Sequence, residues 1–258
     1  NSGGRTEYVS RITLNNTEVT GTRVSTYIRS SQDANDGVLS YIGVVDVSAS
    51  DVLAVESDRT DGTSSDLSAD ANIQIWQLPA GNETFIVEAT ATGDMDPSSI
   101  TEYTWEATPH IDSGGFTDTS ATDSIIEPAV DGDYLFFATM ATDNGEVRRV
   151  SSGRFSVNDT VITHASGGQF NRGGGADDAG YSFGTILNGL TANDDVSLET
   201  LGLADLTGSQ QPDYAAMSGI RLDSIFTSNA TPAITSVTDS PDPVNPQSIL
   251  TFSVDWSD

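Results

Sequence analysis

The chain of 258 residues contains no cysteine and no lysine, and it has only two histidines. Without cysteine it has no disulfide framework, no thiol nucleophile and no thiolate metal site. His110 and His164 stand outside any metal-ligand spacing, and the sequence has no nucleophile-elbow motif. The sequence therefore predicts a protein that is not an enzyme.

Positive charge is also scarce, because ten arginines face 38 acidic residues and the formal net charge is −28. Such a chain repels the phosphates of nucleic acids and anionic lipid surfaces, which excludes nucleic acid as a partner. No run of about twenty apolar residues is present, so we expect no membrane insertion. The surplus acid suits a salty environment or bound divalent cations, and a plain solvated surface also explains it.

What the chain does contain is the same piece twice. Residues 11–57, the first copy, lie over residues 154–200, the second copy, without a gap and at an offset of 143 residues. A repeated unit of this length is a domain-scale repeat. Its nine identical pairs are Arg11 and Arg154, Asn15 and Asn158, Thr17 and Thr160, Thr20 and Thr163, Arg29 and Arg172, Gly37 and Gly180, Ala49 and Ala192, Asp51 and Asp194, and Glu56 and Glu199.

Helix signals are nearly absent, whereas short segments alternate apolar and polar residues with a period of two. Asn15-Asn16 and Asn158-Asp159 lie at matching places between two such runs. Asn and Asp accept left-handed backbone angles, so we expect a tight hairpin turn at both places. The sequence predicts an all-β fold, with strands at 11–14, 73–78, 84–89, 134–140, 154–157 and 220–225.

The two copies differ in what precedes them. Apparent strands at 84–91, 100–107 and 134–142 come before the second copy, and almost nothing comes before the first. We therefore predict a partial domain at 1–80 and a complete one at 81–228. The strands missing from the partial domain are either truncated, which we favour, or supplied by a neighbouring chain.

A family resemblance is carried by the order of motifs around the second copy. Gly132-Asp-Tyr-Leu-Phe-Phe-Ala is followed by Arg154-Phe-Ser-Val-Asn and then by Leu190-Thr-Ala-Asn-Asp-Asp-Val-Ser-Leu. This order resembles the C1q/tumour-necrosis-factor-like jelly roll, and the first copy keeps its later part. The resemblance implies tandem jelly-roll β-sandwiches that form a compact trimer with an apolar axis. Candidates for that axis are Tyr134, Phe136, Tyr181 and Phe183, for which an ordinary core position is the alternative.

The character of the chain changes at Asn229, after which four prolines punctuate residues 232–246. The stretch from Thr235 to Pro246 resembles the opening of the immunoglobulin-like repeats found on prokaryotic cell-surface proteins. Residues 249–256 then alternate like a strand. We predict that residues 229–258 are a linker with the first strands of a further β-domain, or a strand that docks on another subunit, with Trp256 at that interface.

Calcium is the predicted cofactor, because hard oxygen ligands cluster in several loops. None of these loops follows the twelve-residue pattern of a helix-based calcium site, and Asx-rich turns without metal have the same composition. The candidate ligands are Asp33, Asn35, Asp36, Asp131, Asp133, Asp143, Asn144, Asp177, Asp178 and Asp194.

Four asparagines begin an Asn-x-Ser/Thr tripeptide, the acceptor pattern for glycans in secreted proteins. They are Asn15, Asn82, Asn158 and Asn229, and for the repeated pair we favour the turn interpretation.

Together these features favour a non-enzymatic extracellular protein, structural or adhesive, that self-associates as a trimer or polymer in a surface assembly or filament. A virion decoration, fibre or tail protein is the first alternative. The second is a carbohydrate-binding module with Trp76 and Trp105 as sugar platforms, although a core position is the simpler interpretation of each tryptophan. A surface glycan or a protein receptor is the partner that these hypotheses imply.

Overall fold

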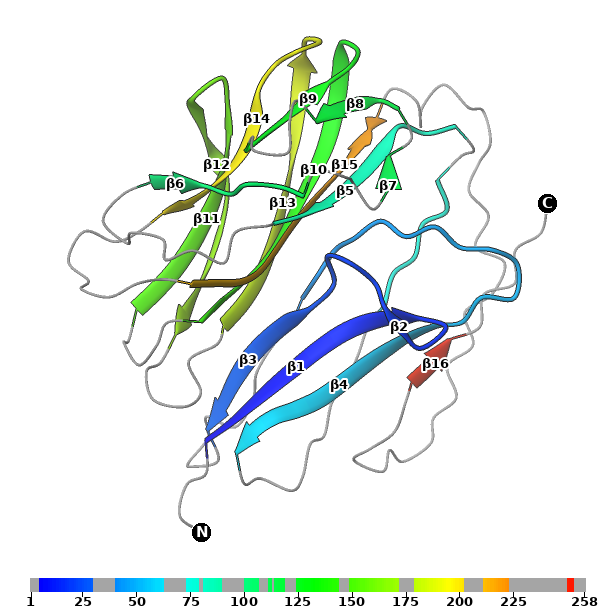
Figure 1. The fold of residues 1–258 in the computed structure, drawn as a ribbon, viewed down its shortest axis with the longest axis vertical. Helices are drawn as coiled ribbons and strands as arrows, with labels where there is room; N and C mark the ends of the chain where they lie inside the picture. The colour runs from blue at the N-terminus through cyan, green and yellow to red at the C-terminus, as the bar shows by residue number, and fades with distance from the viewer. Residues whose placement is uncertain are drawn as a thin grey trace.

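The computed structural model describes residues 5–29, 40–62, 73–78, 81–89, 100–106, 111–112, 114–118, 124–143, 149–171, 179–201, 211–222 and 250–252. Its regular elements there are β-strands arranged in three antiparallel sheets (Figure 1). The prediction of an all-β fold is confirmed. Within these ranges no helix is long and apolar enough to cross a membrane.

The second and third sheets face each other and form a jelly roll. The second sheet has the order β13-β10-β15-β5-β7, and the third has the order β12-β11-β14-β9-β8 with β6 also on β14. The strand bounds are β5 Thr84–Glu88, β6 Ile100–Glu102, β7 Ile111–Asp112, β8 Phe116–Asp118, β9 Ile125–Pro128, β10 Gly132–Asp143, β11 Arg149–Val157, β12 Thr160–Asn171, β13 Ala179–Leu190, β14 Val196–Leu201 and β15 Gln211–Arg221.

Strand pairing identifies the jelly roll. Of the eight strands β5 and β9 to β15, the first pairs with the last, β5 with β15. Pairing continues inward as β9 with β14, β10 with β13 and β11 with β12. Pairing that nests in this way from the two ends toward the middle, across two sheets, is the jelly-roll topology.

Aromatic rings fill the space between these two sheets. Phe85 and Phe116 have ring centroids 4.4 Å apart, and Phe136 stands 6.0 Å from Phe155 across the sandwich. Trp105 is fully buried, and its indole N–H donates a hydrogen bond of 3.0 Å to the carbonyl oxygen of Ser124. Burial of such large apolar surfaces is the main favourable term in the stability of this unit.

The first sheet contains the first copy. It consists of β1 Arg5–Leu14, β2 Thr17–Glu18, β3 Val24–Arg29, β4 Leu53–Gly62 and β16 Leu250–Phe252. β1 pairs with β2, β3 and β4, as β11 pairs with β12 and β14. The pairs Arg11↔Glu56 and Arg154↔Glu199 show that the register is also the same. The sequence repeat is therefore repeated in structure as this arrangement of strands. β13, which also lies in the second copy, joins the second sheet, and residues 40–47, which match its latter part, form no strand.

Two predicted strands differ from the structure. Residues 73–78 form no strand and pair with no described strand, although Ile73, Ile75 and Leu78 are half-buried. The alternation there reports one-sided burial, and a strand also needs a hydrogen-bonded neighbour. Of the segment expected at 220–225, Ile220 and Arg221 are the end of β15, which runs from Gln211 to Arg221, and residues 223–225 lie outside the described residues. Because residues 215–220 are buried on both faces, β15 has no alternation for the sequence to reveal.

Candidate functional site

A hairpin corner occurs once in each copy and is built by the same side chains. Asn15 and Asn16 have φ angles of 51° and 65°, and Asn158 and Asp159 have 49° and 59°. Leu14 pairs with Thr17 and Val157 with Thr160, so each loop has two residues, and positive φ at both is what the favoured hairpin turn requires. The prediction of tight turns at these asparagines is confirmed.

The turn asparagine is tied to the loop that precedes β4 or β14. The side-chain amide of Asn15 donates to Asp51 Oδ1 at 2.7 Å and accepts from the amide of Val52 at 3.0 Å. Asn158 makes the same two bonds, to Asp194 Oδ1 at 2.7 Å and from the amide of Asp195 at 2.9 Å. The asparagine and the aspartate are thus the same in both copies because they make the same hydrogen bonds at the corner.

The aspartate of each corner is held by a second bond. The amide of Ser48 donates to Asp51 Oδ2, and that of Thr191 donates to Asp194 Oδ2, each at 2.7 Å. For Asp51 the bond from Ser48 and then the bond from Asn15 lower the pKa of the carboxyl below its ordinary value. For Asp194 the bond from Asn158 comes first, followed by that from Thr191. Both carboxylates therefore work as structural anions of the corner.

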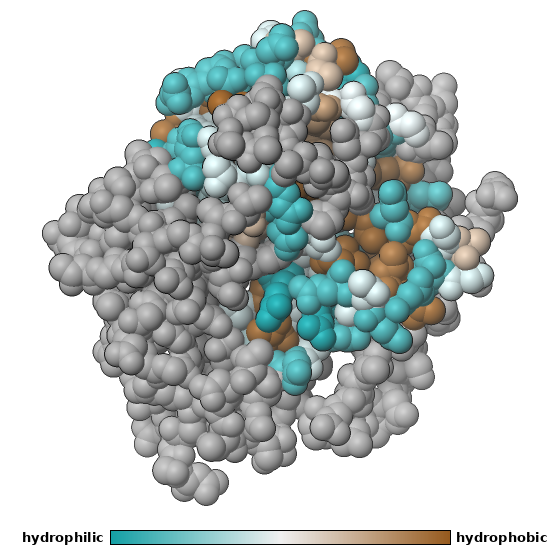
Figure 2. Space-filling view, viewed as in Figure 1, coloured by the Kyte–Doolittle hydropathy of each residue, from teal (hydrophilic) through white to brown (hydrophobic). Residues whose placement is uncertain are grey.

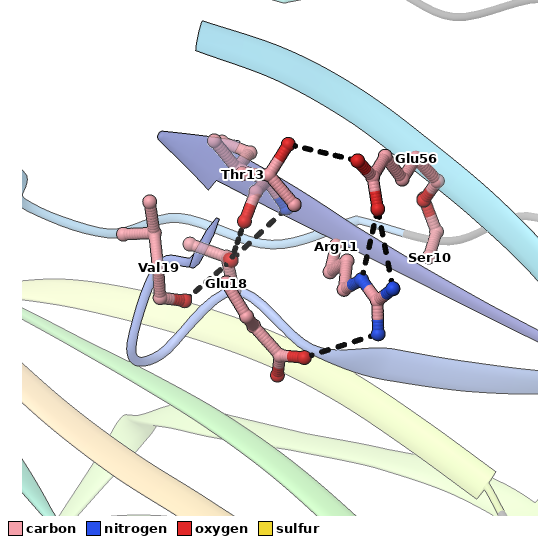
Figure 3. Close-up of polar contacts among 8 residues, drawn as sticks. Ser10, Arg11, Thr13, Glu18, Val19 and Glu56 are labelled. Atoms are coloured by element: carbon pink, nitrogen blue, oxygen red, sulfur yellow. Dashed lines mark hydrogen bonds and ion pairs between the residues drawn. The ribbon is translucent and has the colours of Figure 1, made fainter. Parts of the chain in front are cut away.

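An arginine–glutamate pair bridges the central strands of each copy. Figure 3 shows Arg11 on β1 between Glu56 and Glu18, with N···O distances of 3.2 Å and 3.3 Å, and Thr13 bound to the other oxygen of Glu56. In the second copy Arg154 Nε donates to Glu199 Oε2 at 2.6 Å. The second pair is the more buried, with side-chain exposures of 16% and 8% against 35% and 27% for Arg11 and Glu56.

Three candidate calcium ligands are described, and each accepts a bond from a backbone amide. Asp131 Oδ1 accepts from Ala192 at 2.8 Å, and Asp133 Oδ1 accepts from Gly189 at 2.7 Å. Asp194 serves the corner described above. Across the described ranges, no three His, Asp or Glu side chains gather in a geometry that could hold a metal ion.

The other candidate ligands lie where the structure does not describe them. Asp143 ends β10, and its side chain is outside the described part. The remaining six, Asp33, Asn35, Asp36, Asn144, Asp177 and Asp178, lie outside the described residues altogether. Calcium binding stays a prediction.

The four glycan candidates have different surroundings. Asn15 and Asn158 are exposed at their turns, with the side-chain amide engaged by aspartate. Asn82 is only 7% exposed, and its amide nitrogen is buried without a hydrogen-bond partner among the described residues, so the folded chain leaves no room for a glycan there. Asn229 lies outside the described residues.

The aromatic residues predicted to line a trimer axis belong to the core of the jelly roll. Tyr134 and Phe136 have no exposed surface and Tyr181 is 7% exposed, while Phe183 is partly buried against the same cluster. Aromatic residues are equally suited to a core and to an interface. These four side chains point inward between the two sheets, and they therefore belong to the core. Trp105, a proposed sugar platform, is also fully buried, whereas Trp76 is 70% exposed. Trp256 lies outside the described residues.

The first sheet lies against the jelly roll, on the face of the second sheet that points away from the core. β3 contacts β13 and β10 there. On that face Thr139 stands directly between Ser182 and Ala216. Ser182 donates to the carbonyl oxygen of Ser40 at 2.5 Å, and a Cβ on Gly21 would lie 3.4 Å from that of Ala216. Sequence reasoning missed this contact because its residues are small and polar.

The opposite edge of the first sheet is closed by β16. Leu250, Thr251 and Phe252 pair with Val55, Ala54 and Leu53. In the jelly roll, β9 pairs with β14 at Val196 and Ser197, the residues that the repeat matches to Leu53 and Ala54. β16 thus occupies on β4 the place that β9 occupies on β14.

No family model matches the chain, and no curated protein matches it. Solved structures do. The globular domain of zebrafish complement 1qA is 16% identical, with 55% of this chain and 97% of that chain covered and a TM-score of 0.37. Murine APRIL crystallised at pH 8.5 is 12% identical, with 54% and 99% covered and a TM-score of 0.39. A second crystal of murine APRIL, at pH 8.0, gives 11% identity, the same coverage and a TM-score of 0.35.

The jelly roll rests on the strand pairing of this chain and not on these neighbours. At TM-scores below 0.5 they carry no argument about assembly or ligands. The functional argument therefore rests on the contacts of this chain.

Proposed function

We propose that the chain is a non-enzymatic structural subunit that self-associates outside the cell. The observation that carries the proposal is the use of the repeated side chains. Among the nine identities, the arginine binds the glutamate across neighbouring strands, and the hairpin asparagine binds its aspartate across two turns, in both copies. What the two copies share is thus a set of structural contacts, and this supports a structural role for the repeated unit.

Two features of the first sheet support self-association. Its strand order is that of one half of a sandwich, and it is completed by contacts from other parts of the chain. The segment 40–52, which leads into β4, adds exposed apolar side chains at Ile42, Val47 and Val52, with exposures of 42%, 38% and 46%. Figure 2 shows this hydrophobic surface in the region of β2 and the segment 40–52. Apolar patches on an otherwise acidic surface are typical of interaction sites.

Charge sets the conditions under which assembly is expected. A net charge of −28 opposes the approach of two copies when the Debye length is about 10 Å, near 0.1 M salt. At about 1 M salt the length falls to about 3 Å and the repulsion is screened. We therefore propose a saline or cation-rich setting, with calcium as the cofactor that neutralises part of the charge.

The test is the mass of the full chain in solution by light scattering, at about 0.1 M and about 1 M salt, each with calcium and with a chelator. The proposal expects a mass of several chains at high salt or with calcium. A single chain under all four conditions would overturn it. Antibody labelling of cells and of purified virus particles then separates a cell-surface protein from the virion alternative.

Trp76 supports a second candidate, the recognition of carbohydrate. Its side chain is 70% exposed, and the neighbouring Gln74 and Gln77 are also exposed. An exposed indole beside amide groups is suited to stacking on a sugar ring and bonding its hydroxyls. Binding on a glycan array that is lost in Trp76→Ala and kept in Trp76→Phe would support this function, and an array without hits would remove it.

A further inference from the structure

We propose that the outer edge of β4 is the assembly edge of the chain, and that its occupant in an assembly is β16 of a second copy. In an isolated chain the same edge is occupied in cis by its own β16. This inference rests on the proposed self-association and names the surface through which it occurs.

The first step of the argument is the place of β4 in the first sheet. One side of β4 pairs with β1 and the other side pairs with β16. Without β16, the backbone groups of Leu53, Ala54 and Val55 on that side would have no partner among the described strands. An unpaired strand edge is a template for pairing with another chain.

The second step is the register. β16 places Phe252 opposite Leu53 and Thr251 opposite Ala54. β9 places Ile126 opposite Val196 and Ile125 opposite Ser197, at the matching positions of the repeat. The outer edge of β4 therefore matches the edge of β14 that pairs with β9. The jelly roll fills this place with a nearby strand of its own, whereas the first sheet fills it with β16, a strand from far along the chain. β16 thus supplies the edge strand that the first sheet lacks.

The third step is reach. Residues 223–249 separate β15 and the residue after it from β16, and a stretch of that length spans at most about 90 Å. β16 is three residues long and belongs to the first sheet through β4 alone among the described strands. A connection of this length is long enough for β16 to reach the β4 of its own chain or that of a neighbouring chain.

The fourth step is the balance between the two occupants. Pairing in cis and pairing in trans make the same backbone hydrogen bonds, so concentration decides between them. The effective concentration of a tethered strand is in the millimolar range, and dilute chains therefore pair in cis. Chains crowded in an assembly exceed that range, and each β16 then joins the next first sheet. Because each chain has one donor strand and one acceptor edge, the chains join head to tail, and the product is a linear polymer unless the ends meet and close a ring.

The absence of cysteine makes the test direct. Ala54→Cys and Thr251→Cys place two thiols at directly opposed positions of β4 and β16 in a chain that has no other thiol. The matched control is Ile125→Cys with Ser197→Cys, which occupies the same positions on β9 and β14 inside the jelly roll. Each double variant is oxidised at micromolar concentration in low salt, and again when concentrated at high salt. The linked peptides are identified by mass spectrometry.

A mixture of two single variants separates cis from trans. Chains with only Ala54→Cys, labelled with ¹⁵N, are mixed with unlabelled chains that carry only Thr251→Cys. A disulfide between position 54 of a heavy chain and position 251 of a light chain can form only in trans.

We expect the double variant to close within one chain when dilute and to give a ladder of linked chains when concentrated. A hundredfold rise in concentration should raise the ratio of interchain to intrachain links about a hundredfold. The control pair should close within one chain throughout. The heavy–light link should appear with the ladder.

Three results would overturn the inference, and they differ in what they leave standing. Assembly seen by light scattering with only intrachain links removes strand exchange and keeps the proposed function. Closure of the control pair without any link between positions 54 and 251 shows that β16 does not lie on β4, again with the proposed function intact. Absence of assembly under all conditions removes both proposals.

Discussion

Gly180 on β13 and Ser25 on β3 lie so close that a Cβ placed on the glycine would stand 2.6 Å from the backbone nitrogen of Ser25 and 3.0 Å from the Cα of Val24. Both atoms belong to the backbone, so no rotamer change can relieve the contact. At this point the second sheet therefore accepts β3 because position 180 has no side chain.

Gly180→Ala should loosen the first sheet from the jelly roll, because β3 must shift to admit the methyl group. Overpacking of this kind costs about 1–3 kcal/mol. Hydrogen exchange of the β1 and β3 amides should become faster. Gly167→Ala is the control, since its added Cβ meets the ring of Phe183 inside the jelly roll, 2.6 Å away. If both variants leave the exchange of β3 unchanged, the contact between the two units does not hold the first sheet.

Arg154→Ala should cost more than Arg11→Ala, although the two arginines are identical in the repeat. Removing Arg154 leaves Glu199, 6% exposed, as a buried charge without its ion-pair partner, at a cost of about 3 kcal/mol. Arg11 lies in an open pair, where a loss below about 1 kcal/mol is expected. Denaturant unfolding of both variants measures the difference.

Replacing the whole buried pair provides the control for this prediction. Arg154→Met combined with Glu199→Met removes both charges and should recover much of the loss. Equal losses for Arg11→Ala and Arg154→Ala would show that burial does not set the strength of these pairs.

Local turn chemistry could be predicted from the sequence because it depends on a few adjacent residues. Asn15-Asn16 and Asn158-Asp159 adopt left-handed angles that few other residues tolerate, so their type and place specify the turn. The strands β10 and β11 were also foreseen, because one of their faces is apolar. The same pattern could not tell whether Tyr134 and Phe136 point into the core or toward another chain, since both sites select aromatic residues.

The long-range contacts could not be predicted from the sequence, for physical reasons. Gly180, Ser182 and Ala216 form a contact surface through small size, which leaves no hydrophobic signal. Residues 73–78 alternate like a strand, yet alternation does not show whether a neighbouring strand is available. The pairing of β16 with β4 joins segments almost 200 residues apart and follows from no local rule.

Trp105→Ala should lower the stability strongly, whereas Trp76→Ala should change it little. Trp105 has no exposed surface and packs beside Tyr103 with ring centroids 6.2 Å apart, so its removal should cost about 3–5 kcal/mol. Trp76 is 70% exposed, and its removal should change stability by less than about 0.5 kcal/mol. Thermal unfolding measures both, and Trp105→Phe should keep more of the stability than Trp105→Ala. A large loss in Trp76→Ala would mean that Trp76 packs against the chain.

The repeated corners should make the chain sensitive to acid. Because hydrogen bonds lower the folded-state pKa of Asp51 and Asp194, each corner stabilises the folded chain fully above the ordinary aspartate pKa of about 4. This contribution is lost as the pH falls below that value and through the lowered folded-state pKa, where the carboxylates become protonated. Unfolding measured in steps from pH 6 to pH 2 should show the loss.

Asp194→Asn separates this effect from the titration of the other acidic residues. The new amide side chain at position 194 cannot accept hydrogen bonds from both the Thr191 amide and the Asn158 side chain, as the two oxygens of the carboxylate do. The variant should therefore be less stable at pH 6 and should lose less stability on acidification. Asn158→Ala removes the first cause of the pKa shift and should reduce the acid sensitivity while Asp194 itself is kept. Since Asn158→Gly preserves the positive φ of the turn, it isolates the loss of the side-chain bonds from backbone strain. Acid sensitivity equal to that of the unaltered chain in both Asp194→Asn and Asn158→Ala would show that the corner does not contribute to it.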